Sequence, residues 1–110
     1  MEQMKFLSIK LWCDFKWYTE CLFDFGDNSE LSMGKKHEID GYTAGLRYAK
    51  IITEEQRNAI LDEVRAIHSK WFERFVSGIA KVKKEETVKE IVAKVKVSIE
   101  NILLEKEESR

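Results

Sequence analysis

The chain has 110 residues, which suits one domain and is too short for a protein-kinase catalytic domain. Hydrophobic residues make up 44% of it, which is enough for a packed core and argues against a wholly disordered chain. Charged residues make up 35% but nearly cancel, with a formal net charge of -1, so the composition excludes a strongly basic nucleic-acid binder.

The cysteines and the N-terminal residues indicate where in the cell the protein is located. Cys13 and Cys21 are too few for a typical disulfide-stapled secreted domain, and the N-terminus lacks the basic-then-apolar layout of a signal peptide. Charged residues such as Lys10 and Asp14 interrupt the early apolar stretch, which excludes a transmembrane helix there. We therefore expect a cytoplasmic protein that does not contact the membrane, with both thiols reduced and buried.

The segment from Leu7 to Phe25 carries apolar residues at nearly every odd position. This two-residue period predicts β-strand with one face on a core. The segment is long for one strand, so we expect either a hairpin with its loop at Asp14–Lys16 or a single bent strand with a bulge near Asp14. A turn at 26–29 and a short third strand at 30–35 would complete a meander, making residues 6–36 the β-rich part. The odd positions are Leu7, Ile9, Leu11, Cys13, Phe15, Trp17, Thr19, Cys21, Phe23 and Phe25.

Large apolar side chains also occur at even positions of this segment, at Phe6, Trp12, Tyr18 and Leu22. Either helices cover part of this face of the sheet or the aromatic side chains pair across strands; alternatively, the four residues form a patch that binds a partner or a second copy. Trp and Tyr are enriched at interfaces because they bury a large area at a low cost in conformational entropy. We take these four as the candidate partner-binding residues.

Residues 37–106 are predicted to form three helices. Gly41, Gly45 and Ala49 lie four residues apart and indicate a strip where another element packs closely. The stretch Thr53-Glu54-Glu55-Gln56 is a capping box that would begin the next helix, which is expected to end at 77–78. Its apolar stripe comprises Ile60, Leu61, Val64, Ile67, Trp71, Phe72, Phe75 and Val76.

The last helix carries a heptad-like seam. Apolar residues recur at steps of four and three, which predicts a helix that packs on its own domain or on a second copy. A homodimer would use Val92, Val95, Ile99 and Ile102. Because the segment is rich in β-branched residues, a strand at 93–99 remains the alternative. The end of the chain, 107–110, is expected to fray.

The stretch Asp24-Phe25-Gly26 spells the magnesium-binding triplet of protein kinases, but the other kinase motifs are missing. The following acids lack the ligand spacing of a calcium loop, and the chain has no CxxC or HExxH motif. A buried thiol is normally inert, so we do not expect the cysteines to pair with His37 or His68 in catalysis. We expect no metal, no cofactor and no enzyme activity, with Phe25 buried and Asp24 solvated.

A second class of function rests on basic residues. Lys35, Lys36, Arg47 and Arg57 are candidate ligand-binding residues for a small anionic ligand, a nucleotide or nucleic acid, and an aromatic side chain would stack on a base. A helix-turn-helix regulator with its corner at 51–53 is the weaker alternative, because Glu54 and Glu55 would repel phosphate.

The stretch IDGYTAGLRYAKIITEEQRNAILDEV, residues 39–64, resembles a helix–corner–helix segment of small proteins from low-GC Gram-positive bacteria and their phages. The shared features are a helix that carries glycine and tyrosine, an Ala-x-Ile-Ile-Thr corner and an acidic cap. The resemblance implies a mobile-element accessory protein. Such proteins often act stoichiometrically, as anti-defence inhibitors such as anti-CRISPRs, as sponges for nucleotide signals or as transcription modulators.

These observations together predict an α+β domain, with an N-terminal antiparallel β-hairpin or meander followed by three α-helices. The predicted function is that of a small non-enzymatic protein that inhibits its target by protein–protein interaction, in the manner of a phage or anti-defence accessory protein. The alternative is a sponge or sensor for a small anionic ligand, a nucleotide or nucleic acid.

Overall fold

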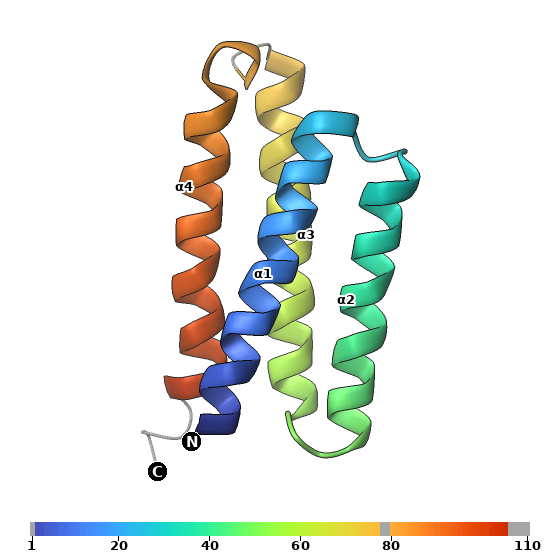
Figure 1. The fold of residues 1–110 in the computed structure, drawn as a ribbon, viewed down its shortest axis with the longest axis vertical. Helices are drawn as coiled ribbons and strands as arrows, with labels where there is room; N and C mark the ends of the chain where they lie inside the picture. Colours follow the sequence, from blue (N-terminus) through green and yellow to red (C-terminus); the bar gives the residue numbers. More distant parts are fainter. Residues whose placement is uncertain (1, 78–79, 106–110) are drawn as a thin grey trace.

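A computed structural model shows an antiparallel bundle of helices, which run alternately up and down (Figure 1). It describes residues 2–77 and 80–105, and the side chains of residues 3–74 and 84–104. The α-helices are α1 (Glu2–Phe25), α2 (Glu30–Tyr48), α3 (Glu54–Ser77) and α4 (Ala80–Glu100), and a π-helical turn, η1 (Asn101–Glu105), follows α4. Helix α1 crosses in front of α3, with α2 and α4 on either side (Figure 1), and it contacts all three of these helices.

The predicted α+β fold is wrong, because the described part of the chain is helical and contains no strand. The segment 6–36, predicted to be β-rich, holds most of α1 and the beginning of α2. The hairpin loop expected at Asp14–Lys16 and the alternative bulge both fall inside α1, which continues without interruption. The third strand expected at 30–35 is the first part of α2.

The misleading alternation arises because two opposite faces of α1 are apolar. Residues two apart lie about 200° apart around a helix, whereas residues four apart lie nearly above one another. One series of odd positions faces the core, with Leu11 and Phe15 at 0% exposure. The interleaved series points outward from Ile9 to Trp17, with Ile9 at 58% and Trp17 at 54% exposure, and only its next member, Cys21, is buried. Two helical stripes with a period of four therefore combine into an apparent period of two.

Most of the helix predictions for the rest of the chain agree with the structure. The capping box is confirmed, since the Gln56 backbone N–H donates to Thr53 Oγ1 at 3.0 Å and the Thr53 N–H donates to Gln56 Oε1 at 2.8 Å. Helix α3 ends at Ser77 as predicted, and 93–99 is helix rather than strand. The close-packing strip is wrong: a Cβ added at Gly41 or Gly45 would meet open space. The expected fraying at 107–110 lies outside the described residues.

The core lies where α1 meets α3 and α4. On α3, Ile60, Val64, Ile67 and Trp71 are buried as expected, whereas Phe72 is 55% exposed; the side chains of residues 75 and 76 lie outside the described part. The expected dimer seam is also used here, because Val92, Val95 and Ile99 are buried and Ile102 packs partly buried against the core. That seam therefore stabilises the bundle and is not available to a second copy.

A pair of alanine substitutions separates the two faces of α1. We expect Leu11→Ala to lower the free energy of unfolding by about 2–5 kcal/mol, because it leaves a cavity in the core. We expect Ile9→Ala to cost less than about 0.5 kcal/mol, because that side chain is exposed. Urea denaturation of dilute protein measures both values. Similar losses for the two variants would contradict the helical assignment, since only a strand would place both on one buried face.

Candidate functional site

A stripe of exposed apolar side chains runs along the outer face of α1. It consists of Phe6, Ile9, Cys13 and Trp17, which follow one another at steps of three, four and four residues, and we call it the outer stripe. Phe6 is 66% exposed, and Ile9, Cys13 and Trp17 are also exposed. Single exposed apolar residues are ordinary, but a contiguous apolar patch marks an interaction surface. The outer stripe is therefore the candidate binding surface of this chain.

One edge of the outer stripe is held against α4 by Trp12. Its indole N–H donates to the carbonyl oxygen of Val92 at 3.1 Å. The ammonium groups of Lys96 and Lys16 lie 5.2 and 5.9 Å from the ring centre, within reach of a cation–π attraction. Trp12 is partly buried by these contacts, so it anchors α1 on α4 and borders the surface instead of forming its centre.

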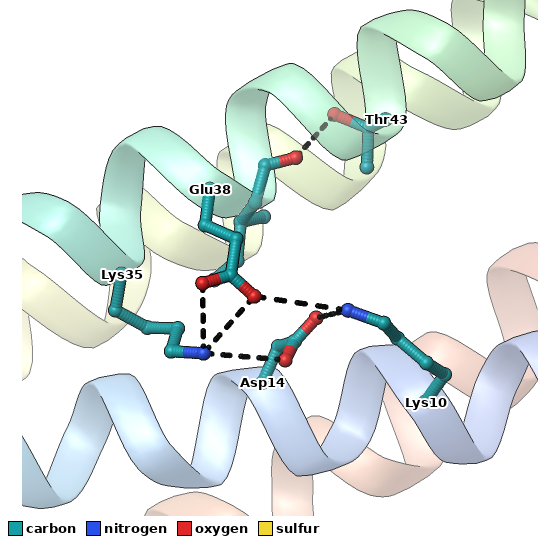
Figure 2. Close-up of polar contacts among 6 residues, drawn as sticks. Lys10, Asp14, Lys35, Glu38 and Thr43 are labelled. Atoms are coloured by element: carbon teal, nitrogen blue, oxygen red, sulfur yellow. Dashed lines mark hydrogen bonds and ion pairs between the residues drawn. The ribbon is translucent and has the colours of Figure 1, made fainter.

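The opposite edge is fixed by charges between α1 and α2, drawn in Figure 2. The Asp14 carboxylate is buried between two lysines, with Lys10 Nζ at 2.5 Å and Lys35 Nζ at 3.6 Å. Glu38 completes the network, at 3.1 Å from Lys35 and 3.9 Å from Lys10. Each carboxylate thus contacts both ammonium groups. Because a buried charge is stable only when it is paired, this network determines how α1 sits on α2.

The pKa of Lys10 reflects this network. Burial alone would lower it, but the hydrogen bond to Asp14 and the negative charges of Asp14 and Glu38 outweigh burial and raise the pKa above 10.5. A raised folded-state pKa means that, while the carboxylates are ionised, protonated Lys10 contributes its full stabilisation below the pKa of the unfolded lysine. That contribution is lost only as the pH rises through the higher, folded-state value.

The four predicted partner-binding residues do not form one surface. Tyr18 and Leu22 are buried in the core, and Trp12 is partly buried, so only Phe6 is openly exposed. Ile9, Cys13 and Trp17 were not predicted, because the two-residue period placed them on the buried face. Cys21 is buried as expected, but the prediction that Cys13 is also buried is wrong. The signal that identifies the missed residues is their own spacing of four.

The four predicted ligand-binding residues are also spread apart. Lys35 belongs to the network with Asp14, Arg47 pairs with Glu54 at 2.5 Å, and Arg57 pairs with Asp40. Lys36 and Arg47 are eleven residues apart on α2, or roughly 16 Å along the helix. Three of the four cations thus hold the helices together. Lys36 borders a cavity whose wall also includes Tyr18, Asp27 and His68.

The Asp24-Phe25-Gly26 stretch ends α1 and turns the chain toward α2. Phe25 is 59% exposed, so the prediction that it is buried is wrong, whereas Asp24 is exposed as expected and forms an ion pair with Lys84. Gly26 has φ of 83°, a left-handed conformation that favours glycine, and its N–H donates to the Leu22 carbonyl at 2.9 Å. The triplet therefore serves as a helix end.

Comparisons with known proteins give no assignment. No protein-family model, curated protein or solved structure matches this chain significantly. Within residues 2–77 and 80–105, no three His, Cys, Asp or Glu side chains come together in a way that could hold a metal ion. None of the described helices has both the length and the apolar character needed to cross a membrane. The outer stripe is therefore identified as a candidate binding surface from its geometry alone.

Removal of the central carboxylate tests the charge network. We expect Asp14→Ala to lower the free energy of unfolding by about 1–3 kcal/mol, because it leaves two closely placed lysines with Glu38 as their only remaining carboxylate in the network. The control is Asp62→Ala, which breaks an exposed pair with Arg65 and should change stability little. Urea denaturation at neutral pH measures both. Equal effects would show that the Asp14 network does not hold α1 on α2.

Proposed function

We propose that this chain is a non-enzymatic protein-binding module whose binding surface is the outer stripe of α1. One observation carries the proposal: the outer face of α1 carries Phe6, Ile9, Cys13 and Trp17, which are exposed and lie outside the hydrophobic core of the bundle. Large apolar and aromatic side chains of this kind supply most of the binding energy where proteins associate. An amphipathic helical surface with anchors at steps of three and four fits another helix.

The occupant we propose is a second copy of this chain, with the two α1 helices antiparallel. Ile9, Cys13 and Trp17 are spaced evenly, four residues apart. A two-fold axis at Cys13 would therefore place each Ile9 at the level of Trp17 of the second copy, and each Cys13 beside its own copy. Self-complementarity of this kind is what a two-fold dimer requires.

Charge supports the same arrangement. About this axis, Lys5 of one copy lies at the level of residue 21 of the other, one residue from Glu20. Opposite charges placed in this way fix the register of two helices. Since the outer stripe offers only four apolar side chains from each copy, the interface is at the small end of the range for specific complexes, and we expect micromolar association.

We also propose a biological setting for this binding. Stoichiometric binding without catalysis is how accessory inhibitors of mobile elements act, and the resemblance of residues 39–64 is the ground for placing this chain among anti-defence or phage accessory proteins. A cytoplasmic location is proposed because the cysteines in the structure, Cys13 and Cys21, are both free thiols.

Sedimentation equilibrium tests whether a second copy of this chain binds the outer stripe. We expect a reversible monomer–dimer equilibrium that Trp17→Ser shifts toward monomer by at least about tenfold, because the variant removes a central aromatic anchor. Phe72→Ser is the matched control: it also removes an exposed aromatic, on α3, and should leave the equilibrium unchanged. A chain that stays monomeric at NMR concentrations would eliminate the second copy. Equal effects of the two variants would eliminate the outer stripe as the contact.

Cross-linking at Cys13 tests the antiparallel register. A short bismaleimide, added at concentrations where the dimer forms, should produce a covalent dimer through the two Cys13 thiols. Cys13→Ser should abolish this product, whereas Cys21→Ser should not, because Cys21 is buried and burial raises the pKa of its thiol. A dimer that forms in solution but does not cross-link would contradict the axis at Cys13, and a parallel or shifted pairing would replace it.

A further inference from the structure

A polar cavity of about 190 Å³ lies beside the turn that joins α1 to α2. Figure 1 shows this turn at one end of the bundle. Its walls come from three places: the last turns of α1, the turn and first half of α2, and the middle of α3. The side chains that matter for its chemistry are Tyr18, Asp27, Asn28, Lys36, His37 and His68. The outer stripe contributes none of its residues to this cavity.

Tyr18 is the unusual member of this set. Its side chain is only 2% exposed, yet it lines the cavity, and among the described residues its hydroxyl has no hydrogen-bond partner. The ring is enclosed by the core, whereas the hydroxyl oxygen is not among the buried side-chain atoms and so reaches the space of the cavity. Burial and the nearby charge of Asp27 raise the pKa of Tyr18 to about 12, so the hydroxyl keeps its proton and can donate. The cavity wall therefore carries a hydroxyl donor that makes no hydrogen bond with the described residues and that a ligand or water in the cavity can engage.

The one carboxylate in the cavity wall is already engaged. His68 Nε2 lies 3.0 Å from Asp27 Oδ2, a contact that joins α3 to the turn between α1 and α2. On the other wall, Lys36 brings an ammonium group that makes no ion pair with the part of the chain the structure describes. An ammonium group and a hydroxyl donor that line the same cavity are suitable partners for an anion.

The remaining polar groups also favour a ligand that accepts hydrogen bonds. Asn28 has an amide that can donate, His37 has an imidazole N–H, and Lys36 and Tyr18 donate as described. Donors thus come from three segments that converge on one small space, against a single carboxylate that His68 already contacts. A ligand rich in acceptor oxygens satisfies this arrangement, whereas a cation would find too few acceptors.

We propose that this cavity binds a small molecule through its phosphate group, with Tyr18 and Lys36 as the donors that contact the phosphate oxygens. The cavity is large enough for a phosphate and a short organic substituent, and too small to enclose a whole nucleotide. The proposal shares only Lys36 with the basic set predicted from the sequence. It does not depend on the binding surface proposed for α1.

Titrations followed by two-dimensional ¹H–¹⁵N NMR test this site, with inorganic phosphate and glycerol 3-phosphate as the probes. We expect saturable shifts of the Tyr18, Asn28, Lys36 and His68 amide signals. Tyr18→Phe and Lys36→Ala should each weaken binding by roughly tenfold, the loss expected for one hydrogen bond to a charged group. Lys89→Ala, at an exposed lysine on α4, is the matched control and should change nothing.

The titrations either support the phosphate site or overturn it. Saturation by both probes, or by glycerol 3-phosphate alone, supports the site, and the second case identifies a phosphate ester as the ligand. Absence of saturable binding by either probe overturns the proposal, as do shifts that neither variant weakens. The free Tyr18→Phe protein should be as stable to urea as the parent, because its hydroxyl has no partner to lose. A marked loss of stability would assign the hydroxyl a structural role and would also overturn the proposal.

Discussion

Helix α1 packs against all three other helices of the bundle, and this central position governs the rest of the structure. Contacts on three sides require a broad arc of buried side chains, which is why fully buried Leu11, Phe15 and Leu22 are joined by buried polar groups such as Thr19 and Asp14. These two polar groups are satisfied: Thr19 donates to the Phe15 carbonyl at 2.7 Å, and Asp14 is paired with lysines. Polar residues inside this arc obscured the amphipathic pattern that ordinarily reveals a helix.

The sequence predicts those elements whose signals are local. The capping box at Thr53 and the apolar stripe of α3 involve residues three or four apart, so they can be identified without knowledge of the neighbours. Helix α1 could not be identified in this way, because its two apolar faces combine into the period of a strand. To tell a helix from a strand here, one must know that Ile9 and Leu11 point in opposite directions. Their directions depend on the helices that surround α1, and the sequence of α1 alone does not reveal them.

Part of the candidate site could be predicted from the sequence in the same way. Phe6 could be found because a large apolar residue at an even position did not fit the strand, whereas Ile9 and Trp17 fitted it and were assigned to the core. The basic residues failed for a different reason. Lys35 and Arg57 were expected to face a ligand, but their carboxylate partners, Asp14 and Asp40, lie on other helices. Pairing across helices depends on the fold, and composition gives no indication of it.

Adjacent residues of α1 serve the two proposed sites. Trp17 faces outward on the surface, and Tyr18, the next residue, points inward and lines the polar cavity. Successive residues on a helix are about 100° apart, so one rigid element presents one of these side chains to a protein and the other to a small ligand. Substitution of Trp17 leaves the cavity walls intact, and removal of the Tyr18 hydroxyl leaves the outer stripe intact. The two sites can therefore be separated experimentally, and coupling between them would have to pass through a movement of α1 against the network at Asp14.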